Sequence, residues 1–301
     1  MDFEKAIIIR DKTRLEQLIE RFNSKAQAKF YIESSGGDFN FFEEEHDTFY
    51  VSLSVIKDSI SKLFKYKIID RSFLSTYIFT ETDLIFVIGQ DGLVANTAKY
   101  VKGFPIVGVN PDKKKYDGVL LKHSPKDIKI LLKSILKREF EVKKVTMAQA
   151  KLNDGQTLLA FNDFYIGANS HVSSRYEIEF EGKKEIQSSS GIIISTGAGS
   201  TGWLSSIFNM ANNISGGYDR ANLDWADDKL VFVVREPFLS KVTNIDIGLG
   251  IITKTKKLKI KSNMPTKGII FSDGIESDFL NFNSGSLVEI SIAKEKASLV
   301  I

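Results

Sequence analysis

The first third of the chain alternates two kinds of apolar pattern. Short continuous apolar runs are typical of strands buried on both faces of a parallel sheet, and they fall at residues 5–10, 83–89 and 105–110. Apolar residues that recur every three or four positions predict helices, and they fall at residues 13–22, 49–64 and 92–101. Strand, helix and strand at this spacing predict βαβ units, and therefore an α/β domain with a parallel sheet.

The rest of the chain has a mainly β pattern. After a helix expected at 125–137, short alternating or apolar runs follow one another, separated by turn residues such as Asn153-Asp154-Gly155. We therefore expect two domains, an α/β domain over residues 1–124 and a mainly β domain over residues 125–301. The strands expected in the second domain are 141–146, 157–166, 175–180, 191–196, 229–234, 258–260, 268–272 and 286–292, with one helix at 203–213.

Charge and composition narrow the class of protein. The 301 residues include 41 basic and 38 acidic side chains, a net charge of +3 that is too even to indicate a nucleic-acid partner. The absence of cysteine rules out disulfides, thiolate nucleophiles and cysteine-ligated zinc, and three histidines leave little for a histidine-based metal site. The densest basic run, Lys113-Lys114-Lys115, is either a solvated loop or a phosphate contact.

Signals for export or membrane insertion are missing from the sequence. Residues 1–5 lack the basic-then-apolar order of a signal peptide. No apolar run approaches the length of a membrane span. We therefore expect a cytoplasmic protein with no membrane partner.

Gly89-Gln90-Asp91-Gly92 stands between a predicted buried strand and a predicted helix. Backbone N–H groups at a helix N-terminus can hold phosphate, and open α/β sheets bind ligands at the carboxyl edge of their strands. Asp91 could therefore accept a proton from a hydroxyl, as the catalytic aspartate does in phosphoryl transfer. The alternative is an Asp-Gly loop that only turns the chain.

A second glycine-rich segment covers residues 197–202 (GAGSTG) and fits the G-x-G-x-x-G dinucleotide fingerprint. Asp219 stands about where an acidic partner of a ribose would be expected. The β-rich surroundings and the late position in the chain weaken this interpretation. A tight turn from strand to helix is the alternative.

Two further polar pairs interrupt apolar runs. Asn162 and Asp163 stand inside the run 157–166, and they either cap a neighbouring turn or bind a ligand, because unpaired burial of polar groups is costly. Neighbouring strand residues point to opposite faces, so at most one of the two can lie on the main face of a site. Asp273-Gly274 is explained by a hairpin turn alone.

In order and spacing, these segments resemble the NAD kinase family. Gly89-Gln90-Asp91-Gly92 resembles the Gly-Gly-Asp-Gly signature of that family, and residues 105–110, which end in Asn110, resemble its following strand. Asn162-Asp163 resembles the family's Asn-Glu pair.

The later segments extend this resemblance. Residues 195–203 resemble the family's Ser-Thr-Pro-Thr-Gly-Ser-Thr-Ala-Tyr segment, and residues 271–274 resemble a late Asp-Gly turn, so that the similarity spans about residues 83–280. The branch that the chain resembles most is the mitochondrial type, on residues 173–178 and 188–191. Most of the family has an aspartate where this chain has Ser190, as is expected for the mitochondrial type.

The resemblance implies the two-domain fold of NAD kinases, with a Rossmann-like α/β domain, an all-β, sandwich-like C-terminal domain and the site between them. It also implies a homodimer or homotetramer that transfers the γ-phosphoryl group of ATP to the 2′-hydroxyl of the adenosine ribose of NAD, with Mg²⁺ neutralising the triphosphate. Asp91 would be the base that engages the attacking hydroxyl. The residues implied in binding the substrates are Gly89, Gln90, Gly92, Asn110, Asn162, Asp163, Ser190, Thr196, Thr201, Gly202, Trp203, Ser206 and Asp273.

Two residues depart from the family pattern. Gln90 replaces the second glycine of the signature, where glutamine would be strained if the backbone needs positive φ. Leu93 replaces a threonine, which removes one hydroxyl that could contact phosphate or magnesium. The alternatives to an NAD kinase are therefore a catalytically degenerate NAD- or NADP-binding regulatory protein and a kinase of the same fold that acts on another hydroxyl. A dehydrogenase is a further alternative, but the sequence shows no convincing set of catalytic histidine or tyrosine residues for one.

Overall fold

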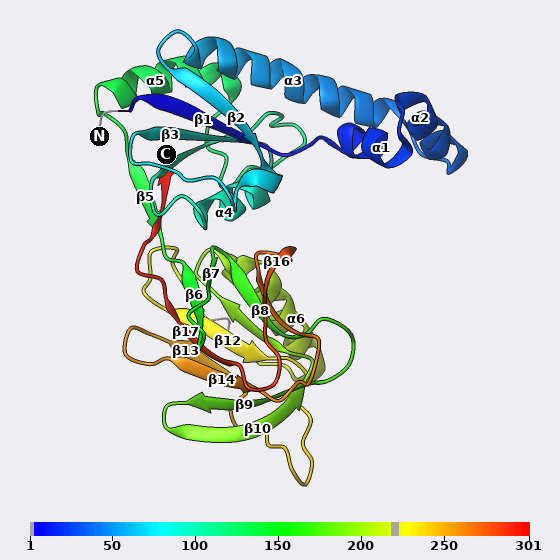
Figure 1. The fold of residues 1–301 in the computed structure, drawn as a ribbon, viewed down its shortest axis with the longest axis vertical. Helices are drawn as coiled ribbons and strands as arrows, with labels where there is room; N and C mark the ends of the chain where they lie inside the picture. The colour runs from blue at the N-terminus through cyan, green and yellow to red at the C-terminus, as the bar shows by residue number, and fades with distance from the viewer. Residues whose placement is uncertain (1–2, 218–222) are drawn as a thin grey trace. The chain divides into compact units, whose positions relative to one another are not determined.

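The structure is a computed structural model that describes residues 3–217 and 223–301. The chain divides into two compact units, of which the first comprises the residues up to Lys143 together with Ser298–Ile301, and the second comprises Lys144–Ala297. The first unit is α/β and the second is mainly β, as the apolar patterns predicted (Figure 1). The division falls later than residue 124, because a helix that follows this residue packs into the core of the first unit.

The first unit is built on a six-stranded sheet in the order β2-β1-β3-β4-β18-β5. The pairs β1 with β2, β1 with β3, β3 with β4 and β4 with β18 are all parallel. The central strand β3 is buried along its whole length, as its continuous apolar run predicted. The strand bounds are β1 (Lys5–Arg10), β2 (Lys65–Asp70), β3 (Asp83–Ile88), β4 (Pro105–Val109), β5 (Val142–Val145) and β18 (Ala297–Val300).

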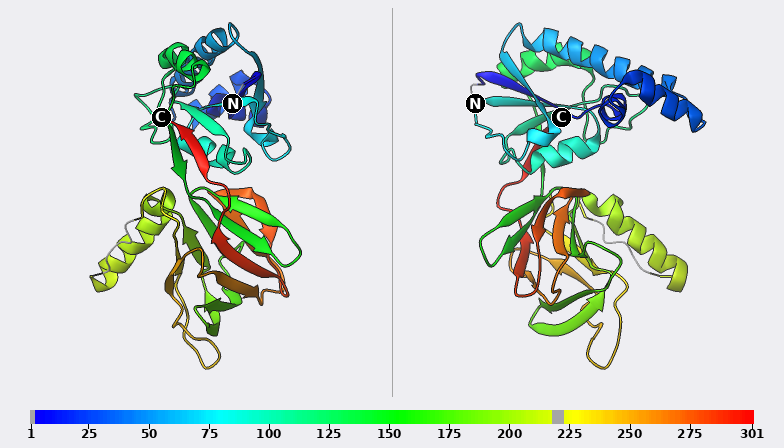
Figure 2. Two further views of the ribbon diagram at one scale, coloured as in Figure 1. Left: turned by 90° about the vertical axis from the view of Figure 1, so that its left-hand side faces the viewer. Right: turned by 45° about the vertical axis from the view of Figure 1, so that its right-hand side comes forward.

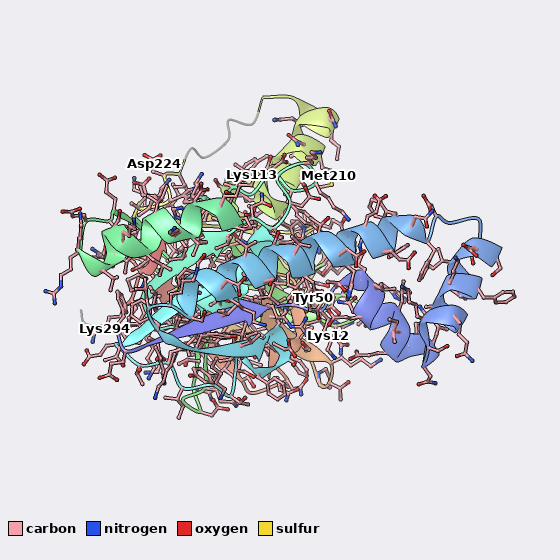
Figure 3. All side chains as sticks on the ribbon, turned by 90° about the horizontal axis from the view of Figure 1, so that it is seen from above. Lys12, Tyr50, Lys113, Met210, Asp224 and Lys294 are labelled. Carbon is pink, nitrogen blue, oxygen red and sulfur yellow. The ribbon has the colours of Figure 1, made fainter. Side chains whose placement is uncertain are left out.

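Helices cover both faces of this sheet. α3 and α5 lie on one face (Figures 1 and 3), and α4 lies on the other face (Figure 1). Ile56 of α3 and Leu132 of α5 pack against sheet residues such as Phe86. Near Phe39, a smaller apolar cluster joins α1 and α2 to the start of α3. The bounds are α1 (Arg14–Phe22), α2 (Lys25–Ser34), α3 (Asn40–Ile60), α4 (Asp91–Ala98) and α5 (Ile128–Leu136), with short 3₁₀ turns η1 (Arg71–Phe73) and η2 (Pro125–Asp127).

The second unit is a sandwich of two six-stranded sheets, in the orders β10-β9-β14-β17-β6-β7 and β13-β12-β11-β8-β15-β16. Figure 2 shows the two sheets as stacked layers. Their facing sides share one apolar core, in which Tyr176 and Ile260 of the first sheet meet Phe164 and Phe232 of the second. The strands are β6 (Ala148–Leu152), β7 (Thr157–Ala160), β8 (Asp163–Ala168), β9 (Ser174–Phe180), β10 (Lys183–Ser189), β11 (Ile192–Ser195), β12 (Leu230–Val234), β13 (Leu249–Ile252), β14 (Leu258–Ser262), β15 (Gly268–Ser272), β16 (Ile275–Asn281) and β17 (Leu287–Ile292).

One helix, α6 (Trp203–Ser215), packs on the outer face of the second sheet through Leu204 and Phe208. The strand predicted over 157–166 is wrong in one respect, because the structure has two strands there, β7 and β8, with a break at residues 161–162. Among the helices that the structure describes, none combines the length and apolar character needed to cross a membrane.

Candidate functional site

Asp91 lies where β3 ends and α4 begins. Its two carboxylate oxygens accept hydrogen bonds from the backbone N–H groups of Val119, at 3.0 Å, and Leu120, at 2.8 Å. These bonds tie the turn to the segment that follows β4 and fix the direction of the carboxylate. Each carboxylate oxygen has a second lone pair, so Asp91 can still accept a hydrogen bond from a hydroxyl. Backbone donors have no sequence signature, and sequence reasoning missed Val119 and Leu120.

The residues around Asp91 explain the shape of the turn. Gly89 has a φ of +152°, and a Cβ there would lie 3.3 Å from Leu93 Cδ2. Gln90 has a φ of −110° and a ψ of 162°, an extended conformation that any residue adopts, so glutamine is not strained here. Gly92 faces open space, since a Cβ there would meet nothing within 4 Å beyond its chain neighbours and the backbone of its own helix. Leu93 is 4% exposed and packs beneath the turn.

Asn110 follows β4 and shapes the segment that Asp91 holds. Its side chain is 2% exposed. The amide nitrogen Nδ2 donates to the carbonyl of Tyr116 at 2.9 Å, and the oxygen Oδ1 accepts from the N–H of Asp112 at 3.0 Å. The amide therefore positions the chain after β4, and its role in binding substrate stays a prediction.

In the second unit, Asp273 organises the break between β7 and β8. Its Oδ2 accepts from the N–H of Phe161 at 3.0 Å, and its Oδ1 accepts from the N–H groups of Asn162, at 2.6 Å, and Asp163, at 3.2 Å. The backbone of residues 161–163 therefore bonds to a carboxylate, and the strand is interrupted. Asp273 (φ 55°) and Gly274 (φ 71°) form the two-residue turn between β15 and β16, as the hairpin prediction required.

Asn162 and Asp163 keep their side chains unengaged at this break. Neither side chain makes a hydrogen bond to any residue in the ranges that the structure describes. Asp163 is 9% exposed, and its burial, together with the nearby charge of Asp273, raises the pKa of its carboxyl to about 7. Near neutral pH this carboxyl can therefore act as either a donor or an acceptor toward a ligand.

The glycine-rich segment packs directly on this break. Thr196 donates its N–H to the carbonyl of Asn162 at 2.9 Å and its hydroxyl to the carbonyl of Phe161 at 2.6 Å. A Cβ at Gly199 would lie 2.2 Å from Asn162 O, and one at Gly197 would lie 2.1 Å from Asp224 O. These two glycines are thus explained by close backbone contacts within the protein, which favours the strand-to-helix turn over a dinucleotide loop.

Trp203 belongs to an aromatic cluster at the start of α6. Its ring stacks on Tyr165 at a centroid distance of 5.9 Å and an interplanar angle of 6°. Tyr165 in turn stacks on Phe271 at 5.1 Å. The guanidinium of Arg235 lies 5.4 Å from the centroid of a Trp203 ring. Sequence reasoning identified Trp203 and missed Tyr165 and Arg235, which come from other strands and carry no local motif.

The other predicted site residues of the second unit lie around these two groups. Ser190 donates its hydroxyl to the carboxylate of Glu236, the residue after Arg235. Thr201, Gly202 and Ser206 are exposed, on the 3₁₀ turn η3 (Gly199–Thr201) and the first turn of α6. Asp219 lies outside the described residues. Within the described ranges, no group of three or more His, Asp or Glu side chains is placed to hold a metal ion.

Comparisons with known proteins agree with this architecture. Neither a known protein family nor a curated protein matches the amino-acid sequence. An NAD kinase from Archaeoglobus fulgidus, solved in complex with ATP, superposes with a TM-score of 0.60 at 15% identity, over 98% of this chain and 93% of its own. A yeast NADH kinase, solved with NADH, superposes with a TM-score of 0.61 at 12% identity, over 100% of this chain and 84% of its own.

At 15% and 12% sequence identity, the similarity to these two structures establishes the fold alone. The chain has the two-domain fold of NAD kinases, an α/β domain joined to a domain of antiparallel sheets. The expected fold class is thereby confirmed.

Proposed function

We propose that this chain is an NAD kinase that transfers the γ-phosphoryl group of ATP to the 2′-hydroxyl of the adenosine ribose of NAD. The observation that carries the proposal is Asp91, a carboxylate fixed by two backbone N–H groups at the end of a buried strand and beside the open space at Gly92. In the proposed reaction, Asp91 accepts the proton of the attacking hydroxyl as that oxygen bonds to the γ-phosphorus and ADP leaves.

The proposed NAD contacts are the side chains of Asn162 and Asp163. Their lack of hydrogen-bond partners among the described residues supports the proposal, because partly buried polar groups otherwise lose hydrogen bonds to water without replacement. Amide and carboxyl groups can each bind ribose hydroxyls or a carboxamide. Thr201, Gly202, Trp203 and Ser206 are proposed to line the adenine and nicotinamide sides, with Ser190, Thr196 and Asp273 supporting them.

Magnesium is proposed to enter with ATP. A divalent cation neutralises the negative charge on the phosphate oxygens during phosphoryl transfer. The first unit would supply one carboxylate to such a cation, because the oxygens of Asp91 keep lone pairs beyond their two backbone hydrogen bonds. The triphosphate would supply the other oxygens. We further propose that the protein is cytoplasmic and forms a homodimer or homotetramer. Light scattering of the purified chain would test the oligomeric state.

A coupled assay tests the activity. The purified protein is incubated with NAD, ATP and Mg²⁺, and NADP is detected with an NADP-specific reductase. We expect NADP from the wild type and none from Asp91→Asn, because an amide cannot accept the hydroxyl proton. Asp117→Asn, at an exposed position in the same segment, is the matched control and should stay active. NAD binding without any NADP would overturn the proposal.

One observation favours a second candidate, a catalytically degenerate protein that binds NAD or NADP. Leu93 is 4% exposed and fills the space beneath the turn, where proteins that the sequence resembles carry a threonine hydroxyl. Retained dinucleotide affinity with no turnover across phosphoryl donors would support this candidate. Turnover of ATP with another hydroxyl compound would instead indicate a kinase of the same fold with a different substrate.

A further inference from the structure

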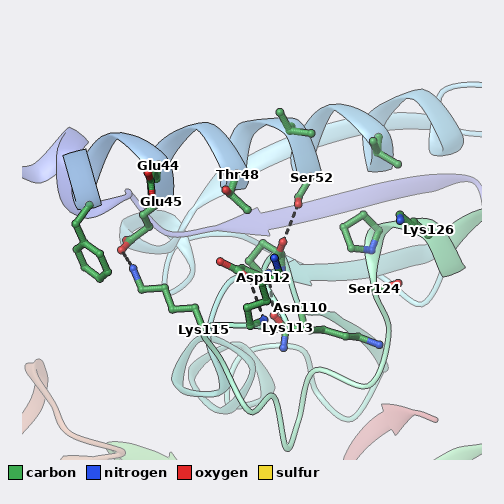
Figure 4. Close-up of a pocket in the computed structure, with 16 residues that line it drawn as sticks. Glu44, Glu45, Thr48, Ser52, Asn110, Asp112, Lys113, Lys115, Ser124 and Lys126 are labelled. Carbon is green, nitrogen blue, oxygen red and sulfur yellow. Dashed lines mark hydrogen bonds and ion pairs between the residues drawn. The ribbon is translucent and has the colours of Figure 1, made fainter.

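A cavity of about 730 Å³ lies entirely within the first unit, and its lining includes Asn110 but not Asp91 (Figure 4). It opens between α3 and the segment that follows β4, and the start of η2 closes its end. This size is that of a typical small-molecule site. Its lining comes from α3, from residues 110–115 after β4 and from residues 124–126.

The helix side of the cavity carries exposed apolar side chains among its polar ones. Val51 is 66% exposed, and Val55 and Phe41 are also exposed on α3. Pro111 and Pro125 add apolar surface on the opposite side. A ligand with a nonpolar body would gain affinity by removing this surface from water.

Charged side chains line the cavity from both the helix and the segment opposite it. Glu45 is neutralised by ion pairs with Arg14 and Lys115, and these cations lower the pKa of its carboxyl despite burial that raises it. Lys113, Lys114 and Lys126 form no ion pair with any residue in the described part of the chain. Three lysines against the two remaining carboxylates of the lining, Glu44 and Asp112, leave an excess of one positive charge in the cavity.

Local hydrogen bonds hold these walls in place. Ser52 donates from α3 to the carbonyl of Pro111 at 2.9 Å, and the bond is drawn in Figure 4. The carboxylate of Asp112 accepts the N–H of Lys114 at 3.0 Å, and Ser124 forms a capping box with Asp127. Thr48 points from the helix toward the same segment with its hydroxyl free of partners among the described residues (Figure 4).

We infer that this cavity binds a small phosphate monoester, whose phosphate contacts Lys113, Lys114 and Lys126 while its nonpolar part lies against Val51 and Val55. Lysine ammonium groups bind phosphate as point charges, and Thr48 adds a hydroxyl donor. For the run Lys113-Lys114-Lys115, the sequence allowed either a solvated loop or a phosphate contact. We assign the phosphate contact to this cavity. The site is separate from Asp91, and its occupancy does not depend on NAD kinase activity.

The segment that lines the cavity also reaches Asp91. Residues 110–115 form the cavity wall, and Val119 and Leu120 bond to the carboxylate of Asp91 a few residues later. A ligand that shifts or stiffens this segment would change how Asp91 is held. The ligand would therefore act on the proposed reaction through the position of Asp91.

Affinity labelling with pyridoxal 5′-phosphate tests the site, because this probe carries both a phosphate and an aromatic body. Its aldehyde forms an imine with a lysine amine and releases water, and borohydride then reduces the imine to a stable amine that peptide mass spectrometry locates. The full-length wild-type chain is labelled at limiting probe, with and without excess pyrophosphate. We expect label at Lys113, Lys114 or Lys126 before other lysines, and loss of that label with pyrophosphate.

Two variants sharpen the result. Val51→Trp fills the cavity and keeps every charge, so labelling of the three lysines should be lost while circular dichroism shows an unchanged fold. Lys62→Ala removes an exposed lysine outside the cavity and should leave the labelling pattern unchanged. Label spread over exposed lysines such as Lys62 and Lys29 would overturn the inference. The same holds for labelling that survives both Val51→Trp and pyrophosphate.

Discussion

The pKa of the Asp163 carboxyl differs between the folded and the unfolded chain. Burial and the charge of Asp273 raise the pKa of this carboxyl to about 7, from 3.8 in the unfolded chain. Well below pH 3.8 both states are protonated, and the site does not change stability. As pH rises from 4 to 7 the unfolded state ionises first, so the folded state loses stability across that window and regains none above it.

Comparison of the wild type with Asp163→Asn isolates this effect. We expect the variant to gain stability relative to the wild type as pH rises from 4 to 8, by about 4 kcal/mol at most. Urea unfolding at both pH values measures the difference. Asp154→Asn is the control with the opposite sign, since hydrogen bonds from Gln156 lower the pKa of Asp154 and its contribution is lost as pH falls. A pH-independent difference for Asp163→Asn would contradict the raised pKa.

Gly92 separates the requirements of folding from those of the proposed reaction. It lies in the first turn of α4 without positive φ, and the position of a Cβ is open. Gly92→Ala should therefore keep the stability of the chain or raise it by about 0.5–1 kcal/mol. In the coupled assay its kcat/KM should fall, because the methyl group enters the space proposed for the phosphates. An unchanged kcat/KM would show that phosphate does not approach this residue.

At the scale of elements, Asp273 decides where β7 ends and β8 begins. Asp273→Asn keeps the side-chain shape and tolerates the left-handed backbone, but its amide cannot accept from all three N–H groups of residues 161–163. We expect a loss of about 2 kcal/mol in the free energy of unfolding, and faster hydrogen exchange of these amides. Glu276→Ala, exposed in the same hairpin, should change stability by less than about 0.5 kcal/mol. Unchanged exchange at 161–163 would exclude this role of the carboxylate.

Elements with a strong apolar period were predictable from the sequence. The continuous run at 83–89 predicted β3, and the spacing at 13–22 predicted α1, which Thr13 caps. α2 and the first turns of α3 were missed, because residues 25–48 are rich in charged and polar side chains and bury only a few apolar ones. The break after β7 was missed because its cause, Asp273, is more than 100 residues away in sequence.

The candidate site was predictable to the extent that it follows local turns. Asp91 was identified from a strand, a glycine turn and a helix in succession, and the structure places it at that junction. The contacts that orient it come from the backbone N–H groups of Val119 and Leu120. Such contacts cannot be predicted from residue type, because almost every residue has a backbone N–H. The glycines at 197 and 199 were open to two interpretations because the sequence does not show what approaches them.

At the scale of the whole molecule, the chain returns to its first unit at its end. β18 lies between β4 and β5, so the last residues complete a sheet that began at Lys5. Sequence reasoning placed these residues in the β domain, because the sequence of a four-residue strand does not indicate which sheet the strand joins. Folding of the first unit is therefore expected to wait for the C-terminal residues, because they close its longest-range pairing.

A chain that ends at Lys296 tests this dependence. It lacks β18, in which Leu299 pairs with Ile106, Val300 enters the core of the first unit, and Ser298 donates its hydroxyl to the carbonyl of Gly103 at 2.7 Å. Loss of three buried apolar side chains (Ala297, Leu299 and Val300) and of the ladder bonds along β4 should cost the first unit on the order of 5 kcal/mol.

Hydrogen exchange read element by element measures this cost. Amides of β3 and β4 should lose protection in the shortened chain, while those of β8 and β11 in the sandwich core keep theirs, because no residue of β18 lies in that core. Removal of Ile301 alone, whose side chain is exposed, is the control and should leave both sets protected. Wild-type protection of β4 in the chain that ends at Lys296 would show that the first unit folds without its last strand.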